Sequence, residues 1–284
     1  KVTSKIVIFL MLALLLFCSV QIIYSFIDFI TTINQLDFLS KNMIMLLNFI
    51  LLGYILKNKI YNLGRFTQVI FVLTIAMIFL LFILGIKDIN YKNLFPFCTL
   101  KTNEFFNNLN VFIAQPFLET TFLFNIFSKI EESKVKKNIF IIVNGISFVF
   151  LLLISIETVG ILGDNYTSFL NFPYYVSISC INVSKIVIRI EAISLIVFYF
   201  SSFVKLMFVT NSFILGFNSI TNTKERYYYP YLLLVHILSL IMYDNLSELK
   251  QFINYYSIFF IIISLVMPFL IIIKKDKNIM KQNT

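Results

Sequence analysis

The sequence has 284 residues, of which 59% are apolar, 17% are aromatic and 13% are charged. Charged side chains usually make up about a quarter of a water-soluble domain, so this composition excludes an ordinary soluble protein. Apolar runs recur near the roughly 20 residues that a helix needs to cross a bilayer. They predict an all-α, polytopic transmembrane helix bundle. The net charge of +9 then indicates membrane topology, and no nucleic-acid partner is expected.

The chain divides into eight apolar segments with short connections, so we expect a single membrane domain over residues 1–284. In chain order the segments are 6–30, 43–56, 66–86, 111–127, 139–162, 186–217, 231–242 and 252–273. The second and the seventh are short. On length alone, each of these two fits a buried, re-entrant or strongly tilted segment as well as a span.

The positions of Lys and Arg test this count. If all eight segments cross, 15 of these residues lie on the face that holds the N-terminus and 6 lie on the other face. Because cytoplasmic loops carry an excess of Lys and Arg, both termini are then expected in the cytoplasm. Omitting the seventh span weakens the split to 12 against 9, whereas omitting the second gives 14 against 7 with the N-terminus outside. Charge therefore supports the seventh span and leaves the second open.

Charges inside the apolar segments are the most informative residues. Each costs roughly 2.5 to 3.5 kcal/mol at the bilayer centre on insertion scales, so such side chains should face the bundle interior. Glu119 and Lys205 are the clearest cases. Four others lie nearer the ends of spans, where an interfacial location explains them as well: Asp28, Glu157, Arg189 and Glu191. Structural ion pairs between helices and a polar cavity or ion path both account for the pattern.

The sixth segment presents Glu191, Ser202 and Lys205 on one helical face. Lys205 lies about 21 Å along the helix from Glu191, at 1.5 Å per residue, so the two cannot pair directly. Glu119 on the fourth segment is the most plausible carboxylate for Lys205. We therefore predict that Lys205 faces the bundle interior towards the fourth segment and gates or stabilises a pocket.

The fourth segment also contains a predicted helix break. Pro116 lacks a backbone donor and disfavours helix at Gln115, which places Gln115, Glu119 and Thr120 around a kinked or unwound stretch. Broken helices in membranes are tolerated where they line a cavity, and transporters bind substrates at them. A proline kink satisfied by neighbouring helices is the alternative.

These patterns give one set of candidate residues. The ligand-binding set is Gln115, Pro116, Glu119, Thr120 and Ser202, and the ion-pair or gating set is Lys205, Glu191 and Arg189. His236 has no metal-spaced partner and is expected to be a hydrogen-bonded packing residue. No nucleophile elbow, phosphate-binding loop, zinc-protease motif or haem motif occurs in the sequence, so neither an enzyme nor a cofactor is predicted.

Several stretches resemble the spore-germination B-subunit family (GerAB type). They are Asn-Leu-Gly-Arg-Phe at 62–66, Asp-Ile-Asn-Tyr-Lys-Asn-Leu-Phe-Pro at 88–96, Phe-Pro-Tyr-Tyr at 172–175, Val-Ile-Arg-Ile-Glu-Ala at 187–192 and Phe-Val-Lys-Leu at 203–206. Glu119 falls where that family has a glutamate in a broken helix. The resemblance covers the whole chain in order.

The resemblance implies a fold and a function. The family belongs to the amino-acid/polyamine/organocation transporter superfamily, with ten or more helices in two inverted five-helix repeats. The eight segments then resemble helices three to ten, the first two helices would precede Lys1, and the short second segment crosses. The implied function is recognition of a germinant, a small nutrient such as an amino acid, in the spore inner membrane, with A-type and C-type subunits as partners. The alternative is a secondary amino-acid or cation transporter in the bacterial cell membrane.

Overall fold

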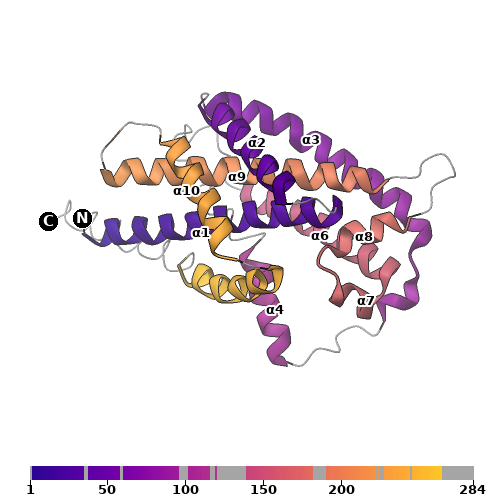
Figure 1. The fold of residues 1–284 in the computed structure, drawn as a ribbon. Coiled ribbons are helices and arrows are strands. Elements are labelled where there is room, and N and C mark those ends of the chain that lie inside the picture. The colour runs from indigo at the N-terminus through magenta and orange to yellow at the C-terminus, as the bar shows by residue number, and fades with distance from the viewer. Residues whose placement is uncertain are drawn as a thin grey trace. The chain divides into compact units, whose positions relative to one another are not determined.

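A computed structural model of the chain describes residues 2–34, 38–57, 60–95, 102–115, 119, 139–181, 190–221, 223, 227–243 and 245–263. In these residues the regular structure is entirely helical, as the composition predicts (Figure 1). The α-helices are α1 (Val2–Asn34), α2 (Phe38–Leu56), α3 (Ile60–Gly85), α4 (Thr102–Ala114), α6 (Ile139–Leu162), α7 (Asp164–Phe169), α8 (Pro173–Ser179), α9 (Glu191–Thr221) and α10 (Tyr228–Ile241). Two 3₁₀ turns, η1 (Ile86–Asp88) and η2 (Tyr91–Leu94), follow α3, and a further helix covers Leu246–Ile263.

Four of the helices are long and apolar enough to cross a membrane by length and composition. They are Ile8–Ile33, Leu63–Asp88, Ile141–Leu162 and Glu191–Thr221. The pair Tyr228–Ile241 and Leu246–Ile263, bent by 116°, is a fifth candidate, either as a broken span or as a re-entrant loop. The structure thus confirms a polytopic helical membrane protein. The count of eight crossings stays a prediction, because much of the fourth and eighth segments lies outside the described residues.

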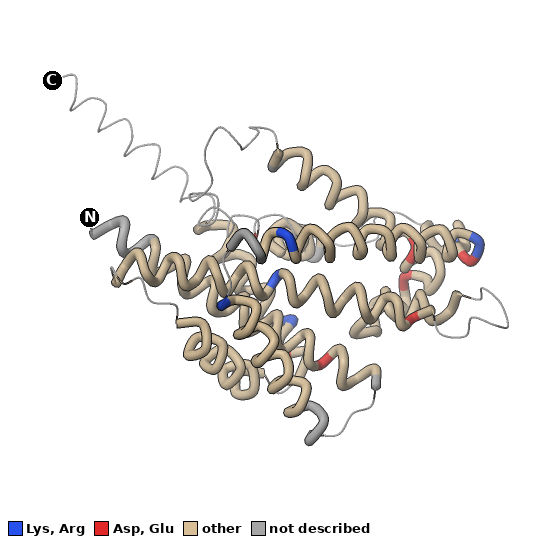
Figure 2. Tube along the Cα trace, turned by 90° about the horizontal axis from the view of Figure 1, so that it is seen from above, with Lys and Arg blue, Asp and Glu red and all other residues tan. Residues whose placement is uncertain are grey.

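Long stretches of the described helices carry no charged residue, as Figure 2 shows. Many large apolar side chains are exposed on the outer surfaces of these helices, Phe71, Ile141 and Phe259 among them. Such exposure would be unfavourable in water and is expected of side chains that face lipid.

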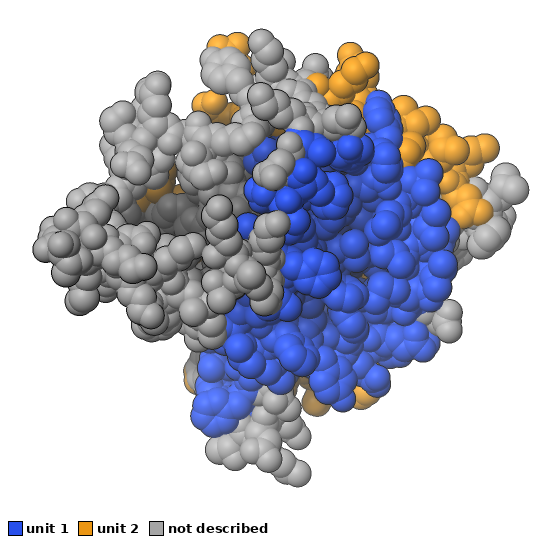
Figure 3. Space-filling model, turned by 90° about the vertical axis from the view of Figure 1, so that its left-hand side faces the viewer, with its two compact units in different colours: residues 1–21, 100–130, 208–284 blue, residues 22–99, 131–207 orange. Residues whose placement is uncertain are grey.

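The described helices group into two compact units, coloured separately in Figure 3. Unit 1 consists of residues 1–21, 100–130 and 208–284, and unit 2 of residues 22–99 and 131–207. Each unit is assembled from stretches that lie far apart in the sequence, so local sequence alone does not define either one.

In unit 1, aromatic pairs join helices that are distant in the sequence, α1 to the helix Leu246–Ile263 and α9 to α10. Phe17 contacts Phe252 with ring centroids 5.5 Å apart, and Phe213 stacks on Tyr231 at 4.1 Å. Leu15, at the same end of α1, is fully buried. Aromatic pairs of this kind add to the stabilisation that comes from burying their apolar area.

In unit 2, α6 packs against α3, α7, α8 and both 3₁₀ turns. The carbonyl oxygen of Gly160 accepts two hydrogen bonds, from the backbone N–H of Asn90 and the side-chain amide of Asn93, both at 3.0 Å. Gly163 ends α6 with a φ of 83°, a left-handed conformation that favours glycine. Pro173 then starts α8 at a position where its missing donor is harmless.

Candidate functional site

A buried polar cluster in unit 1 surrounds the carboxyl group that the sequence singles out. We call it the Glu119 cluster: Cys18, Ser19, Glu119, Tyr231 and Tyr256. The Cys18 thiol donates to Glu119 Oε1 over 3.7 Å. A carboxylate can accept about four hydrogen bonds and a thiol is a weak donor, so this contact orients Glu119 without saturating it.

Ser19, the next residue of α1, holds a second polar contact. Its hydroxyl donates to the carbonyl oxygen of Leu15 at 2.8 Å and lies 2.7 Å from the hydroxyl of Tyr231. Because the Ser19 hydrogen is directed to Leu15, the Tyr231 hydroxyl is the donor in the contact between the two side chains. This pair joins α1 to α10 inside unit 1.

Tyr256 brings a third helix to the cluster. Its hydroxyl donates to the carbonyl oxygen of Leu14 at 3.1 Å, from the helix Leu246–Ile263. The same hydroxyl is close enough to Cys18, Glu119 and Tyr231 to interact with each of them electrostatically. Buried polar groups in such a network stabilise one arrangement of the helices when each finds a partner.

The sequence places these groups on one side of α1. Leu14, Leu15, Cys18 and Ser19 follow one another at the spacing of a helical face, and all four are buried. A thiol and a hydroxyl are small enough to sit between apolar neighbours, so helices can approach closely at Cys18 and Ser19. The polar cluster is thus embedded in the apolar core of unit 1.

Helix α4 ends at Ala114, and Gln115 follows directly. The helix therefore ends two residues before Pro116, where the sequence predicts a break. The backbone N–H of Gln115 still donates to the carbonyl oxygen of Val111 at 3.0 Å. Its side-chain nitrogen is buried and has no hydrogen-bond partner among the described residues. A buried amide donor without an acceptor is costly, and a bound anionic or carbonyl group would supply the acceptor.

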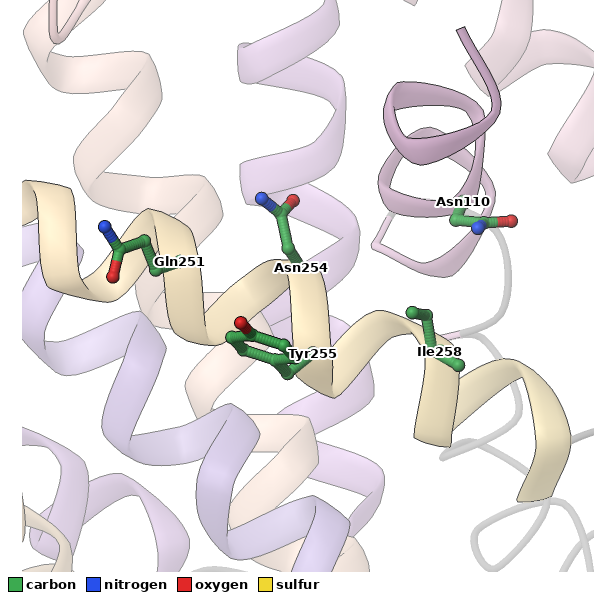
Figure 4. Close-up of a pocket in the computed structure, with 5 residues that line it drawn as sticks. All are labelled: Asn110, Gln251, Asn254, Tyr255 and Ile258. Atoms are coloured by element: carbon green, nitrogen blue, oxygen red, sulfur yellow. The ribbon is translucent and has the colours of Figure 1, made fainter. Parts of the chain in front are cut away.

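A small hollow lies beside α4 in unit 1. It has a volume of about 230 Å³ and is lined by Asn110 of α4 and by four residues of the helix Leu246–Ile263: Gln251, Asn254, Tyr255 and Ile258 (Figure 4). The four helix residues recur at the spacing of one face. The three amides in this lining can each donate and accept hydrogen bonds.

The remaining predicted residues fall into two groups. Pro116, Thr120 and Arg189 lie outside the described residues. Glu191, Ser202 and Lys205 lie on α9 within unit 2, with Glu191 in the first turn of that helix. The predicted single pocket that joins Ser202 to Glu119, and the predicted pairing of Lys205 with Glu119, therefore stay predictions.

Lys205 lines a cavity of about 450 Å³ in unit 2, between α3, α6 and α9. Most of the lining is apolar, and hydroxyl groups are contributed by Thr67, Thr74, Ser147 and Ser201. The Lys205 side chain is partly buried near the middle of α9. The prediction that Lys205 faces the bundle interior and gates or stabilises a pocket stays a prediction.

Sequence reasoning missed four members of the Glu119 cluster: Cys18, Ser19, Tyr231 and Tyr256. Their common signal is a polar atom on a helix that is otherwise apolar. The Glu157 side chain is completely buried within the protein, with 0% exposure. His236 is a packing residue as predicted: it is buried, and its Nδ1 lies 2.7 Å from the carbonyl oxygen of Leu232.

Among the described residues, no group of three or more His, Cys, Asp or Glu side chains could hold a metal ion. In the Glu119 cluster the carboxyl group can attract a cation, whereas the hydroxyl hydrogens of Ser19, Tyr231 and Tyr256 are already donated to acceptors within the protein.

Comparison with known proteins identifies the family. Residues 1–249 match the sequence model of the spore permease family, described as spore germination protein. Neither the curated proteins nor the solved structures contain a match. Because the family match covers most of the chain, which is helical and has several helices able to span a membrane, the protein belongs to the spore germination protein family.

Proposed function

We propose that this protein is the germinant-recognition subunit of a spore germination receptor in the spore inner membrane. Its ligand is a small nutrient of the amino-acid class. Membership of the spore germination protein family supports the cellular role. The single observation that carries the ligand class is the Glu119 carboxyl group held within the buried Glu119 cluster of unit 1.

An amino acid has an ammonium group that needs a carboxylate and a carboxylate that needs donors. Glu119 would bind the ammonium group, since the low-polarity surroundings strengthen charge attraction there. The Gln115 amide nitrogen, which is buried and has no hydrogen-bond partner among the described residues, would donate to the ligand carboxylate. Gln115 directly follows the end of α4 at Ala114. The helix break predicted at Pro116 would free polar backbone groups between Gln115 and Glu119.

The Glu119 cluster also suggests how binding is transmitted. Side chains from α1, α10 and the helix Leu246–Ile263 meet in it. A ligand that binds Glu119 would change the contacts that Glu119 makes with Cys18 and Tyr256. It would thereby change the packing of the three helices that meet in the cluster. A shift in the population of two such packings is sufficient for a receptor, because ligands act by binding one conformation better than another.

We propose A-type and C-type germination receptor subunits as the partners that receive this shift. No cofactor is needed, because binding and conformational change involve no bond chemistry, and the protein is not expected to be an enzyme. We also propose that both termini lie in the cytoplasm, as the distribution of Lys and Arg favours.

The test is a Glu119→Gln substitution made in the intact gene and examined in spores. The change keeps the size of the side chain and removes its charge, so the germination response to amino acids should be lost or need far more ligand, with normal protein abundance. Glu248→Gln is the matched control, because Glu248 is an exposed carboxyl in the same unit. Loss of abundance alone in Glu119→Gln would instead assign Glu119 a structural role.

A secondary transporter of amino acids or related cations is the second candidate, favoured by the permease character of the family. Transport requires flux coupled to an ion gradient, which recognition does not. Uptake of radiolabelled amino acids by proteoliposomes that contain the purified protein separates the two. Accumulation that collapses with the proton or sodium gradient would establish transport, and binding without accumulation would establish recognition.

A further inference from the structure

A fully buried carboxyl group lies in unit 2. Glu157 belongs to α6, and its side chain has no exposed surface. Neither of its carboxyl oxygens has a hydrogen-bond partner among the described residues. An ionised carboxylate in such a place would have lost its water without gaining a partner, which is strongly unfavourable.

The carboxyl group is held against the end of α3. A Cβ atom built on Gly85 would overlap Glu157 Oε1, and it would lie 3.1 Å both from Glu157 Cδ and from the Cδ1 atom of Ile181. Glycine is therefore the residue that leaves room for the carboxyl group at this point. Ile181 belongs to the apolar cluster of Leu81, Ile178, Ile181 and Ile190, so the carboxyl group borders a fully apolar region.

Tyr174 of α8 lies close enough to Glu157 to interact with it electrostatically. Its hydroxyl is buried and has no hydrogen-bond partner among the described residues. Burial, and to a smaller degree the nearby Glu157 carboxyl, raise the pKa of Tyr174 above its ordinary value. Tyr174 therefore stays a neutral hydroxyl and supplies no charge to neutralise Glu157.

Among the described residues, no other charge offsets a carboxylate at this position. The titratable groups on the described elements around this part of α6 are Lys87 and Asp88 of η1, Tyr91 and Lys92 of η2, Asp164 and Tyr166 of α7, Tyr174 and Tyr175 of α8, and Glu191 and Lys205 of α9. Lys87 and Lys92 are exposed, and in the described part of the chain Glu157 has no ion pair with either. The final turn of α3 presents backbone carbonyls, the negative end of the helix dipole, which disfavours a second negative charge.

We propose that the Glu157 carboxyl group is a proton-binding site enclosed by α3, α6 and α8. One carboxylate oxygen takes a proton from a hydronium ion, leaving water, and the neutral acid is then enclosed. Release of the proton to water requires Tyr174 and α8 to move away from the carboxyl group, so the packing of α8 and the proton occupancy of Glu157 are linked. This site is independent of the proposed recognition site, because Glu119 has no part in it.

The structure favours a proton over a metal cation as the ligand. A sodium or potassium ion needs several oxygen ligands around it, whereas the Glu157 carboxyl is packed on one side against the Gly85 backbone and borders Ile181. A proton needs only the carboxylate itself, and one hydrogen-bond acceptor such as the Tyr174 hydroxyl or a bridging water satisfies the acid.

Infrared difference spectroscopy on the intact protein, reconstituted in lipid, tests the proposal. At pH 7 the wild type should show the C=O stretch of a protonated carboxylic acid, shifted in heavy water. Glu157→Gln should abolish this band completely, and Glu248→Gln, which changes an exposed carboxyl, should retain it. A wild-type spectrum without a band that depends on Glu157 would overturn the proposal. So would loss of the band on adding sodium chloride at constant pH, since a metal cation would then be the ligand.

Two further variants keep the test decisive if Glu157→Gln does not fold. Tyr174→Phe removes the neighbouring hydroxyl, and Gly85→Ala displaces the carboxyl group. Both should shift the frequency of the band, whereas Gly145→Ala in the same helix as Glu157, with nothing within 4 Å of the added methyl, should leave it unchanged. A band that responds to none of these substitutions does not come from Glu157.

Discussion

The hydroxyl groups of Ser19 and Tyr231 lie 2.7 Å apart in a buried contact between α1 and α10, although 212 positions separate the two residues in the sequence. The direction of this hydrogen bond is fixed, because Ser19 gives its own hydrogen to the Leu15 carbonyl. Tyr231 is therefore the donor. Removal of the Ser19 hydroxyl would leave the Tyr231 donor without an acceptor, whereas removal of the Tyr231 hydroxyl would leave Ser19 bonded to Leu15.

We expect Ser19→Ala to destabilise the protein more than Tyr231→Phe does. Ser19→Ala leaves the buried Tyr231 hydroxyl without an acceptor, at a cost of about 1 to 2 kcal/mol, whereas Tyr231→Phe leaves Ser19 bonded to Leu15 and costs about 0.5 kcal/mol. Unfolding the protein with increasing amounts of a denaturing detergent measures both changes in the free energy of unfolding. The double variant should cost less than the sum of the two changes.

Ser155→Ala is the control for the Ser19 substitution. Ser155 also donates to a carbonyl four residues earlier, at 2.8 Å, but its side chain is exposed. Its replacement should change the unfolding free energy by less than about 0.5 kcal/mol. Equal effects at positions 19 and 155 would show that the contact with Tyr231 contributes nothing to stability.

The two described cysteines should differ in reactivity. Cys18 is completely buried in the Glu119 cluster, whereas Cys180 is exposed after α8. In a protein carrying Cys98→Ser, a water-soluble maleimide should label Cys180 in the native state and Cys18 only after denaturation. Mass spectrometry of the labelled peptides distinguishes them. Rapid native labelling of Cys18 would mean that water reaches the cluster freely.

The helical architecture could be predicted because each helix leaves a local signal. Apolar runs, Pro116 after α4 and Gly163 after α6 all mark helices or their ends within a few residues. The polar surroundings of Glu119 could be predicted for the same reason, since one charge in an apolar run requires a polar environment. These inferences need only the neighbouring sequence.

The partners of Glu119 could not be predicted in this way. Cys18 lies 101 positions from Glu119, and a thiol in an apolar run is as compatible with ordinary packing as with a polar contact. The burial of Glu157 depends on Gly85, which belongs to another helix. The position of Glu157 near the end of its span is compatible with a carboxylate at the membrane interface. Only the packing of α3 against α6 reveals that the Glu157 side chain is enclosed.

The glycines provide a test of this enclosure by stability. Gly85→Ala should destabilise the protein by about 1 to 3 kcal/mol, because the added methyl group overlaps the buried Glu157 carboxyl. Gly145→Ala should be neutral or slightly stabilising, since nothing lies within 4 Å of the new methyl and alanine favours helix by about 1 kcal/mol. The two substitutions can be compared by the same detergent unfolding measurement.

Shortening the acid should relieve the overlap at Gly85. Glu157→Asp withdraws the carboxyl group by one methylene, so Gly85→Ala should be less costly in the Glu157→Asp background than in the wild type. The same background should not alter the effect of Gly145→Ala. A cost for Gly85→Ala that is independent of residue 157 would place the overlap elsewhere, with Ile181 as the other contact.

The last prediction concerns orientation in the membrane. With eight crossings, 15 Lys and Arg residues lie on the face that holds the N-terminus and 6 on the other. The positive-inside rule then places both termini in the cytoplasm. Reporter fusions after Lys137 and after Lys277 should both give cytoplasmic signals, and a fusion after Cys180 should give an external one.

An arrangement without the 43–56 crossing places the N-terminus outside but leaves residues 137, 180 and 277 on the same faces. A fusion after Lys41 therefore decides that case, because only eight crossings put this position outside together with Cys180. An external signal after Lys137 or Lys277 would contradict both arrangements.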